Sequence, residues 1–283
     1  ATGELLFFNY SKHAPYMHYG VVDRAGKLVT YIPVPLPGPR LPHDMAFSEN
    51  FSILNDLPVF WDATLLKQGI HAARLHKQPS RFAIVPRHGR TEDIRWFEAA
   101  PCYVLHFLNA YEEGDEIVLD GYFQEDPTPR PMASAPEGYS HMMAYLDEHS
   151  FKSKLHRWRF NLKTGKTTER RLDDRVLEFG MINPRVASRK NRYAYSTTAR
   201  PGWFLFNGFV KHDLETGESW SVQLPEGRYA SEAPFAPRIG AKDEDDGYLV
   251  SFIIDENAGT AECVLIDCKQ IGRASCRERV YHP

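Results

Sequence analysis

Short apolar or alternating runs, each four to eight residues long and ending at a turn residue, make up most of the chain. Successive side chains of a strand point to opposite faces of a sheet, so this pattern predicts strands rather than helices. Residues 59–68 and 139–147 could each form one turn of helix, although neither pattern is strong. The predicted strands are Leu5–Phe8, Tyr19–Val22, Leu28–Ile32, Phe82–Val85, Glu116–Leu119, Arg192–Thr197, Trp203–Val210, Tyr248–Ile254 and Cys263–Ile266.

One turn sequence recurs in near copies, at Asp23–Lys27, Asn161–Lys166 and Asp213–Glu218. Each copy places a glycine between two predicted strands, and glycine adopts the positive φ of a tight hairpin without steric cost. Gly165 and Gly217 are 52 residues apart, close to the ~40–50 residues of a four-stranded propeller blade. A β-sandwich would also have many short strands, but a hairpin that recurs at blade spacing favours a β-propeller.

Two unusual segments do not change this picture. The proline-rich residues 126–138 cannot form a central strand, and similar strand patterns lie on both sides of them. We interpret them as a long surface loop within one domain. The acidic segment 242–247 lacks the spaced ligands of an EF-hand, so we interpret it as a solvated turn rather than a calcium site.

Composition narrows the class of protein. Hydrophobic residues make up 42% and charged residues 25% of the chain, which is typical of a globular protein. The 34 basic and 37 acidic residues give a net charge of −3, which argues against a nucleic-acid partner. No two cysteines have the C-x-x-C spacing of a zinc knuckle, so we expect reduced structural thiols in a cytoplasmic protein. These cysteines are Cys102, Cys263, Cys268 and Cys276.

Two of the twelve histidines stand out. His43 opens an alternating segment, and His106 lies among apolar residues with polar residues just after it. An imidazole near a propeller axis can bind a metal, and an acceptor on its other ring nitrogen then fixes the tautomer. Glu178 and Glu232 are carboxylates in otherwise apolar segments and suit that role. The pattern alone leaves open a second interpretation, in which these residues are core histidines and buried ion pairs.

Five segments, in order along the chain, resemble the carotenoid cleavage oxygenase family. The resemblance covers about residues 1–269, and the 63-residue separation of His43 and His106 suits the family's second and third iron ligands. Met45 stands where the family commonly has Phe, and Gly180 where it commonly has Pro, which leaves the substrate open. The segments are His43–Phe51, Leu105–Glu113, Glu178–Asn183, Ser231–Arg238 and Glu244–Leu249.

This resemblance implies an all-β fold, a partial seven-bladed β-propeller of which about four blades are present. The family holds Fe(II) on the propeller axis with four histidines, three of them supported by glutamates. On this basis His43 and His106 are metal ligands, Glu178 orients His106, and Glu232 orients the fourth ligand. The family's first and fourth histidines have no counterpart in residues 1–283. We therefore expect an internal fragment that is inactive alone, with no catalytic residue beyond the metal site.

The resemblance also implies a reaction and its partners. We expect an Fe(II)-dependent dioxygenase that uses O2 to cleave a conjugated double bond of a carotenoid or apocarotenoid into aldehyde or ketone products. Stilbene cleavage of the lignostilbene type is one alternative. A catalytically incompetent propeller fragment, or a propeller that binds proteins or glycans, is another. The partners are then an apolar polyene or stilbene and O2, and peripheral membrane contact of the full-length protein stays open.

The end of the chain is unlike the family. The residues after Lys269 are basic and carry none of the family's motifs. We expect residues 1–270 to form the partial propeller and residues 271–283 to be an unrelated tail, disordered or artefactual.

Overall fold

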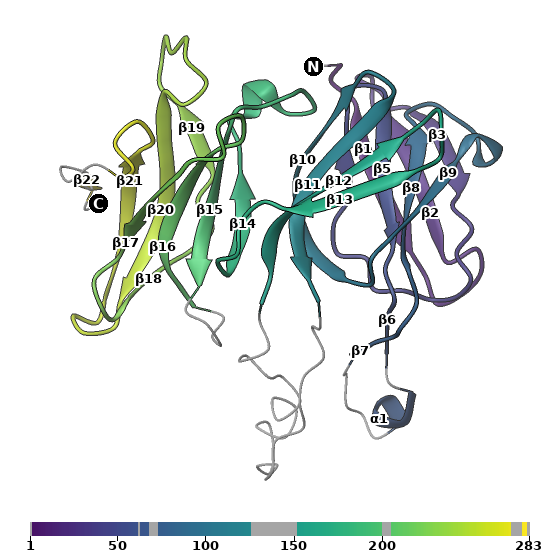
Figure 1. Ribbon diagram of the computed structural model, residues 1–283, viewed down its shortest axis with the longest axis horizontal. Helices are drawn as coiled ribbons and strands as arrows, with labels where there is room; N and C mark the ends of the chain where they lie inside the picture. The colour runs from purple at the N-terminus through teal and green to yellow at the C-terminus, as the bar shows by residue number, and fades with distance from the viewer. Residues whose placement is uncertain are drawn as a thin grey trace.

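The computed structural model describes residues 2–61, 63–67, 73–125, 152–199, 205–272 and 279–281. In these ranges the regular secondary structure is almost entirely antiparallel β-strand, which confirms the all-β prediction (Figure 1). A short helix, α1 (Ala63–Lys67), lies within residues 59–68, where the sequence allowed a helical turn. The second such segment, residues 139–147, and the proline-rich residues 126–138 lie outside the described residues.

The first half of the chain forms two larger sheets and one small one. The first has the order β1 (Leu5–Tyr10), β2 (Met17–Val22) and β3 (Leu28–Pro33). The second has the order β4 (Ala46–Phe47), β5 (Phe51–Asp56), β8 (Ser80–Pro86) and β9 (Arg95–Ala99). A two-stranded ribbon of β6 (Val59–Trp61) and β7 (Ala73–Leu75) projects between β5 and β8.

The second half forms two further sheets. The third sheet has the order β10 (Tyr103–Glu113), β11 (Glu116–Gln124), β12 (Lys154–Asn161) and β13 (Thr167–Arg171). The fourth, nine-stranded sheet starts with β14 (Leu177–Met181), β15 (Tyr193–Ala199), β16 (Phe206–Asp213) and β17 (Ser219–Gln223). It continues with β18 (Arg228–Ala230), β19 (Phe235–Pro237), β20 (Gly247–Asp255), β21 (Thr260–Asp267) and β22 (Arg279–Tyr281).

The sheets form a partial β-propeller. The described residues contain four sheets of three or more strands, consistent with the expected number of blades. The first strands of three successive sheets, β4, β10 and β14, contact one another through β10. Figure 1 shows β10 and β14 near the centre of the molecule, with their sheets extending to opposite sides. The residues that follow His43, His106 and Glu178 are therefore brought to one place.

The recurring hairpin turn has the predicted conformation. Gly26, Gly165 and Gly217 have φ angles of 80°, 72° and 78°. Asn161 and Asp213 each stabilise their turn, because one side-chain oxygen accepts hydrogen bonds from two backbone N–H groups within the next three residues. These turns are local structures, which explains why the sequence alone was enough to predict them.

Aromatic side chains join the second and third sheets. Phe82 on β8 is fully buried, and its ring centroid lies 5.5 Å from that of Trp158 and 5.1 Å from that of Phe160, both on β12. Burying a side chain of this size contributes about 1.5–3 kcal/mol to stability. This core fixes the position of the sheet that begins just after His43 relative to the sheet that contains His106.

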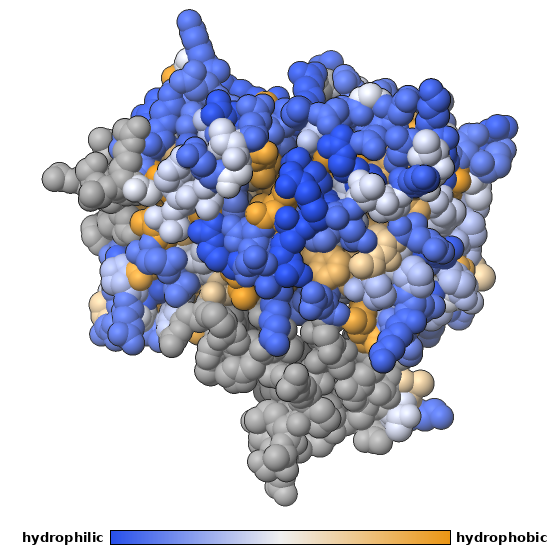
Figure 2. All heavy atoms as spheres, in the orientation of Figure 1, coloured by the Kyte–Doolittle hydropathy of each residue, from blue (hydrophilic) through white to orange (hydrophobic). Residues whose placement is uncertain are grey.

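The surface is mixed. Figure 2 shows a largely hydrophilic face, on which apolar side chains are visible near the centre of the view. Phe252 and Ile254, on the outward face of β20, are 64% and 57% exposed. None of the described helices has the length and apolar character needed to cross a membrane.

The last residues are described in part. Ile271 is 4% exposed and packs in the core of the fourth sheet. Strand β22 pairs with β21, with Cys263 opposite Tyr281. The remainder of the expected tail lies outside the described residues, and a division of the chain at residue 270 stays a prediction.

Candidate metal centre

His106 lies in a β-bulge. Strand β10 advances by three residues from Val104 to Phe107 while β11 advances by two, from Phe123 to Gly121. The extra residue bends the strand and redirects its side chains. Gly121 is required opposite the bulge, because a Cβ atom there would lie 2.8 Å from the Phe107 ring and 3.3 Å from the His106 carbonyl oxygen. The bulge leaves the His106 side chain one quarter exposed.

Glu178 holds the His106 ring. His106 Nδ1 lies 2.8 Å from Glu178 Oε2, and Glu178 on β14 is fully buried. Burial by itself lowers the pKa of His106, but the hydrogen bond and the negative charge of Glu178 raise it above its ordinary value. Because Nδ1 is engaged, Nε2 is the ring nitrogen left for a ligand.

Phe179 supports this contact from the next position. Its φ of 51° lies in the left-handed region, which is rare for a bulky residue. This conformation allows its N–H to donate to Glu178 Oε2 at 2.7 Å. The Phe179 ring also packs 5.2 Å from the His106 ring, centroid to centroid. Strained backbone of this kind is concentrated at functional sites.

The two predicted ligands lie side by side. The ring centroids of His43 and His106 are 5.1 Å apart, and the rings meet edge to face at 81°. The sequence placed His43 at the opening of a strand, whereas β4 begins three residues later, at Ala46. Because Glu178 contacts the His106 ring, the structure brings together three of the four predicted site residues. Their role in binding a metal stays a prediction.

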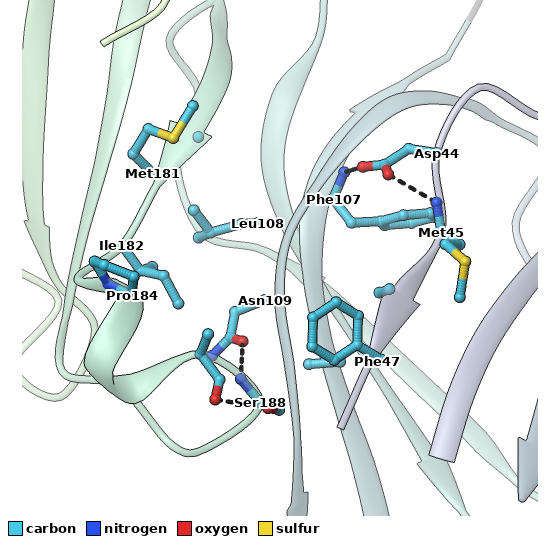
Figure 3. Close-up of a pocket in the computed structure, with 14 residues that line it drawn as sticks. Asp44, Met45, Phe47, Phe107, Leu108, Asn109, Met181, Ile182, Pro184 and Ser188 are labelled. Carbon is cyan, nitrogen blue, oxygen red and sulfur yellow. Dashed lines mark hydrogen bonds between the residues drawn. The ribbon is translucent and has the colours of Figure 1, made fainter. Parts of the chain in front are cut away.

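Asp44 is a site residue that sequence reasoning missed. Its Oδ2 accepts a hydrogen bond from the Phe107 N–H at 2.9 Å, and its Oδ1 accepts one from the Met45 N–H at 2.8 Å (Figure 3). Burial raises the pKa of Asp44, and the two backbone hydrogen bonds offset this only in part. The sequence shows a carboxylate next to a candidate ligand, but it does not show the partner 63 residues away.

Comparison with known proteins identifies the family. The family model described as RPE65, retinal pigment epithelial membrane protein, matches residues 1–283. The chain belongs to this family. The resemblance to carotenoid cleavage oxygenases found in the sequence is thereby confirmed.

Curated relatives carry names from the same class of enzyme. The carotenoid 9,10(9′,10′)-cleavage dioxygenase 1 of Pisum sativum is 35% identical over 95% of this chain and 52% of the relative. The carotenoid cleavage oxygenase of Mycobacterium tuberculosis is 27% identical over 95% of this chain and 62% of the relative. The chain spans about half the length of the plant relatives that it matches.

Two solved structures share the fold. A mutant of the Synechocystis apocarotenoid oxygenase matches with a TM-score of 0.82 and 23% identity, over 95% of this chain and 56% of that chain. The Pseudomonas brassicacearum lignostilbene dioxygenase matches with a TM-score of 0.81 and 24% identity, over 100% of this chain and 61% of that chain. These likenesses establish the partial propeller fold of this RPE65 family member.

Glu232 is placed differently from Glu178. It lies between β18 and β19 and is exposed. Its negative charge contributes to the raised pKa of His106, less than those of Glu178 and Asp44 do. The structure places no histidine ring in hydrogen-bond contact with the Glu232 carboxylate within the described ranges. Its predicted role, to orient a fourth ligand, stays a prediction.

The residues present fit part of an iron site. Neutral imidazole nitrogen suits divalent iron, and a buried carboxylate on the far nitrogen is the usual support of a ligating histidine. Glu178 provides that support for His106. Across the described residues, no group of three or more His, Cys, Asp or Glu side chains could hold a metal ion. This part of the chain therefore brings together two imidazole side chains, one of them with a carboxylate on its far nitrogen, and their binding of iron stays a prediction.

A cavity of about 310 Å³ is lined by Asp44 and by residues that follow His43, His106 and Glu178 in sequence, but not by those three residues themselves (Figure 3). Both departures from the family pattern are among its lining residues. Met45 and Gly180 contribute to a mainly apolar lining. A Cβ atom at Gly180 would lie 2.2 Å from the hydroxyl oxygen of Tyr122, which hydrogen-bonds to Ser196 Oγ at 2.7 Å. The Tyr122 hydroxyl thus fills the space that a side chain at position 180 would need.

Proposed function

We propose that this chain supplies two iron(II) ligands, His43 and His106, to an oxygenase that cleaves a conjugated carbon–carbon double bond of a carotenoid or apocarotenoid. The reaction consumes the alkene and O2 and forms two carbonyl products: R–CH=CH–R′ + O2 → R–CHO + R′–CHO. An alkene carbon with a second substituent gives a ketone instead. The observation that carries the proposal is the arrangement of Glu178 on β14, His106 on β10 and His43 just before β4, in a carotenoid-oxygenase-family fold.

The described side chains have distinct tasks in this proposal. The Glu178 carboxylate accepts a hydrogen bond from the Nδ1–H of His106, which fixes the tautomer and directs the Nε2 lone pair away from the carboxylate. Phe179 packs against the same ring and limits its rotation. When bound, iron(II) would supply the centre at which O2 is activated. The Glu178 charge would offset part of the metal's +2 charge.

The apolar surroundings support a long apolar substrate. The cavity beside the site is lined mainly by carbon atoms, and its residues come from the segments that follow His43, His106 and Glu178. The names of the plant relatives point to carotenoids. A stilbene is the second candidate, because the lignostilbene dioxygenase matches this fold as well as the apocarotenoid oxygenase does.

The test uses the complete reading frame that contains residues 1–283, because the relatives are about twice as long. The purified protein would be assayed for iron content and for O2-dependent cleavage of an apocarotenal and of a hydroxystilbene, in parallel. The His106→Ala variant is compared with His88→Ala. His88 is an exposed histidine that follows β8 and pairs with Glu4 at 2.9 Å, so its contact is with the N-terminal residues rather than with a residue of the site.

We expect His106→Ala to lose iron and cleavage, and His88→Ala to keep both. Cleavage of the apocarotenal but not of the stilbene supports the first substrate class, and the reverse result selects the second. Undiminished iron content and cleavage in His106→Ala would refute the proposal. Absence of both from the unaltered protein would favour an incompetent propeller.

A further inference from the structure

The Asp44 side chain connects the two predicted ligand segments close to both histidines. Farther from the histidines, Glu112 also joins these segments, because its carboxylate accepts hydrogen bonds from Ser48 and Asn50. Asp44 follows His43 directly, and its Oδ2 accepts the N–H of Phe107, which follows His106 directly, at 2.9 Å (Figure 3). This hydrogen bond therefore joins the segment that leads into β4 to strand β10, one residue away from each histidine. A hydrogen bond from a backbone N–H to a carboxylate is stronger than one between neutral groups.

The orientation of the Asp44 carboxylate is fully determined. Oδ1 accepts the Met45 N–H at 2.8 Å, so both oxygens have backbone donors. The Asp44 carbonyl oxygen in turn accepts a hydrogen bond from Asn55 Nδ2 at 2.8 Å, and Asn55 on β5 is 2% exposed. Backbone and side chain of Asp44 are thus fixed from both sheets.

The site needs such a connection at this point. Two shifts in the pairing of β10 with β11 flank Phe107, so the ladder does not hold this stretch in a regular register. His106 has Glu178 as a second anchor. The His43 ring, by contrast, has no hydrogen-bond partner in the described part of the chain. Its position depends on the backbone that Asp44 holds.

We propose that Asp44 is a positioning residue, whose hydrogen bond to Phe107 sets the separation and relative orientation of the His43 and His106 rings. The inference rests on the proposed function only in that the paired rings are taken as metal ligands. The geometric claim concerns two side chains of this chain and is testable without metal.

The chain offers a matched control. Asp23 also accepts two backbone N–H groups, those of Ala25 and Lys27, each at 2.9 Å. It lies in the β2–β3 turn, in a different sheet from both histidines. Asp23→Ala and Asp44→Ala therefore remove the same kind of interaction, and only Asp44→Ala removes it between the two ligand segments.

The first readout is metal-free. In residues 1–283 labelled at histidine, we expect a nuclear Overhauser cross-peak between the ring protons of His43 and His106, whose centroids are 5.1 Å apart. The cross-peak should disappear in Asp44→Ala and persist in Asp23→Ala. If Asp44→Ala fails to fold, Asp44→Asn replaces it. Asparagine has nearly the same volume but one acceptor oxygen for two N–H donors, so Asp44→Asn should weaken the cross-peak.

The second readout is Co²⁺ binding by calorimetry, with the His43→Ala/His106→Ala double variant defining the heat that belongs to this site. Loss of a residue that orients metal ligands typically lowers metal affinity about 10- to 100-fold. We expect the Co²⁺ affinity to decrease at least about tenfold in Asp44→Ala and to stay unchanged in Asp23→Ala.

The outcomes separate the two proposals. Loss of the cross-peak together with weaker Co²⁺ binding supports both. If the cross-peak is lost in Asp44→Ala but the His43→Ala/His106→Ala double variant still binds Co²⁺ with full affinity, the positioning role is supported and the metal site is refuted. A cross-peak that persists in folded Asp44→Ala overturns the positioning role, whatever the Co²⁺ affinity.

Discussion

His106 and Glu178 are 72 residues apart in sequence, yet His106 Nδ1 and Glu178 Oε2 lie 2.8 Å apart between two successive sheets of the propeller. The carboxylate is fully buried and also accepts the Phe179 N–H. Truncation of one member of such a pair leaves the other buried and unpaired, which is costly. The contact therefore links the stability of the fold to the geometry of the site.

Glu178→Gln should weaken metal binding more than it weakens the fold. Glutamine keeps the volume but has a weaker acceptor and no charge, so we expect metal affinity to fall about 10- to 100-fold. The matched control is Glu169→Gln, which alters a second histidine–glutamate pair, His156 Nε2 to Glu169 Oε2 at 3.2 Å. Iron content and Co²⁺ affinity would be measured for both variants. Equal losses in both would show that Glu178 has no specific role at the site.

Gly180→Ala should destabilise the protein through clashes with two side chains, Tyr122 and Leu108. The new Cβ would lie 2.2 Å from the Tyr122 hydroxyl oxygen and 2.7 Å from Leu108 Cδ1. Overpacking of this kind typically costs about 1–3 kcal/mol, measured as a change in the free energy of unfolding in urea.

The Tyr122→Phe substitution provides the second arm of this test. It removes the clashing hydroxyl, so the double variant should recover part of the Gly180→Ala loss, giving a favourable coupling free energy. Tyr122→Phe alone should cost about 1 kcal/mol, because it removes the hydrogen bond to Ser196. Strictly additive effects would contradict the predicted contact.

The free energy of unfolding at low pH should depend on Glu113. The Lys190 ammonium at 2.8 Å, together with Arg159, lowers the pKa of Glu113 to about 2. A carboxyl with a lowered folded-state pKa stabilises the protein above its unfolded-state value and loses that contribution as pH falls through the folded-state value. Urea unfolding of Glu113→Gln should therefore show a smaller loss of stability between about pH 4.5 and pH 2 than the unaltered chain.

The size of the Glu113 effect should be modest. The side chain is 37% exposed, so solvent screens its ion pairs and the contribution stays within the ~0–1 kcal/mol of surface pairs. A pH dependence identical in the two proteins would show that these ion pairs do not form in solution.

Local features could be predicted from the sequence. Strand alternation and the turn glycines, Gly165 and Gly217, depend on residues that are neighbours in the chain, and both predictions are confirmed. The residue types at His106 and Glu178, together with the family resemblance, were enough to propose a pair that the structure places in contact. Their role at a metal remains to be tested.

The features that were missed depend on tertiary structure. The Asp44–Phe107 hydrogen bond joins two sheets, and no spacing in the sequence indicates it. The bulge at His106 requires Gly121 on the opposite strand, and the positive φ of Phe179 arises where β14 changes register. The role of a turn glycine depends on its sequence neighbours and can be predicted from them. The roles of Gly121 and Phe179 depend on which strands pair, so they can be recognised only in the folded structure.

The central claim is that His43 and His106 are two ligands of one iron centre. Its most direct test is the iron content of the protein translated from the complete reading frame around residues 1–283, compared with that of the His43→Ala/His106→Ala double variant. We predict one iron per chain in the first protein and none in the second, and no alkene cleavage by residues 1–283 alone. Iron retained at full stoichiometry by the double variant would contradict the account.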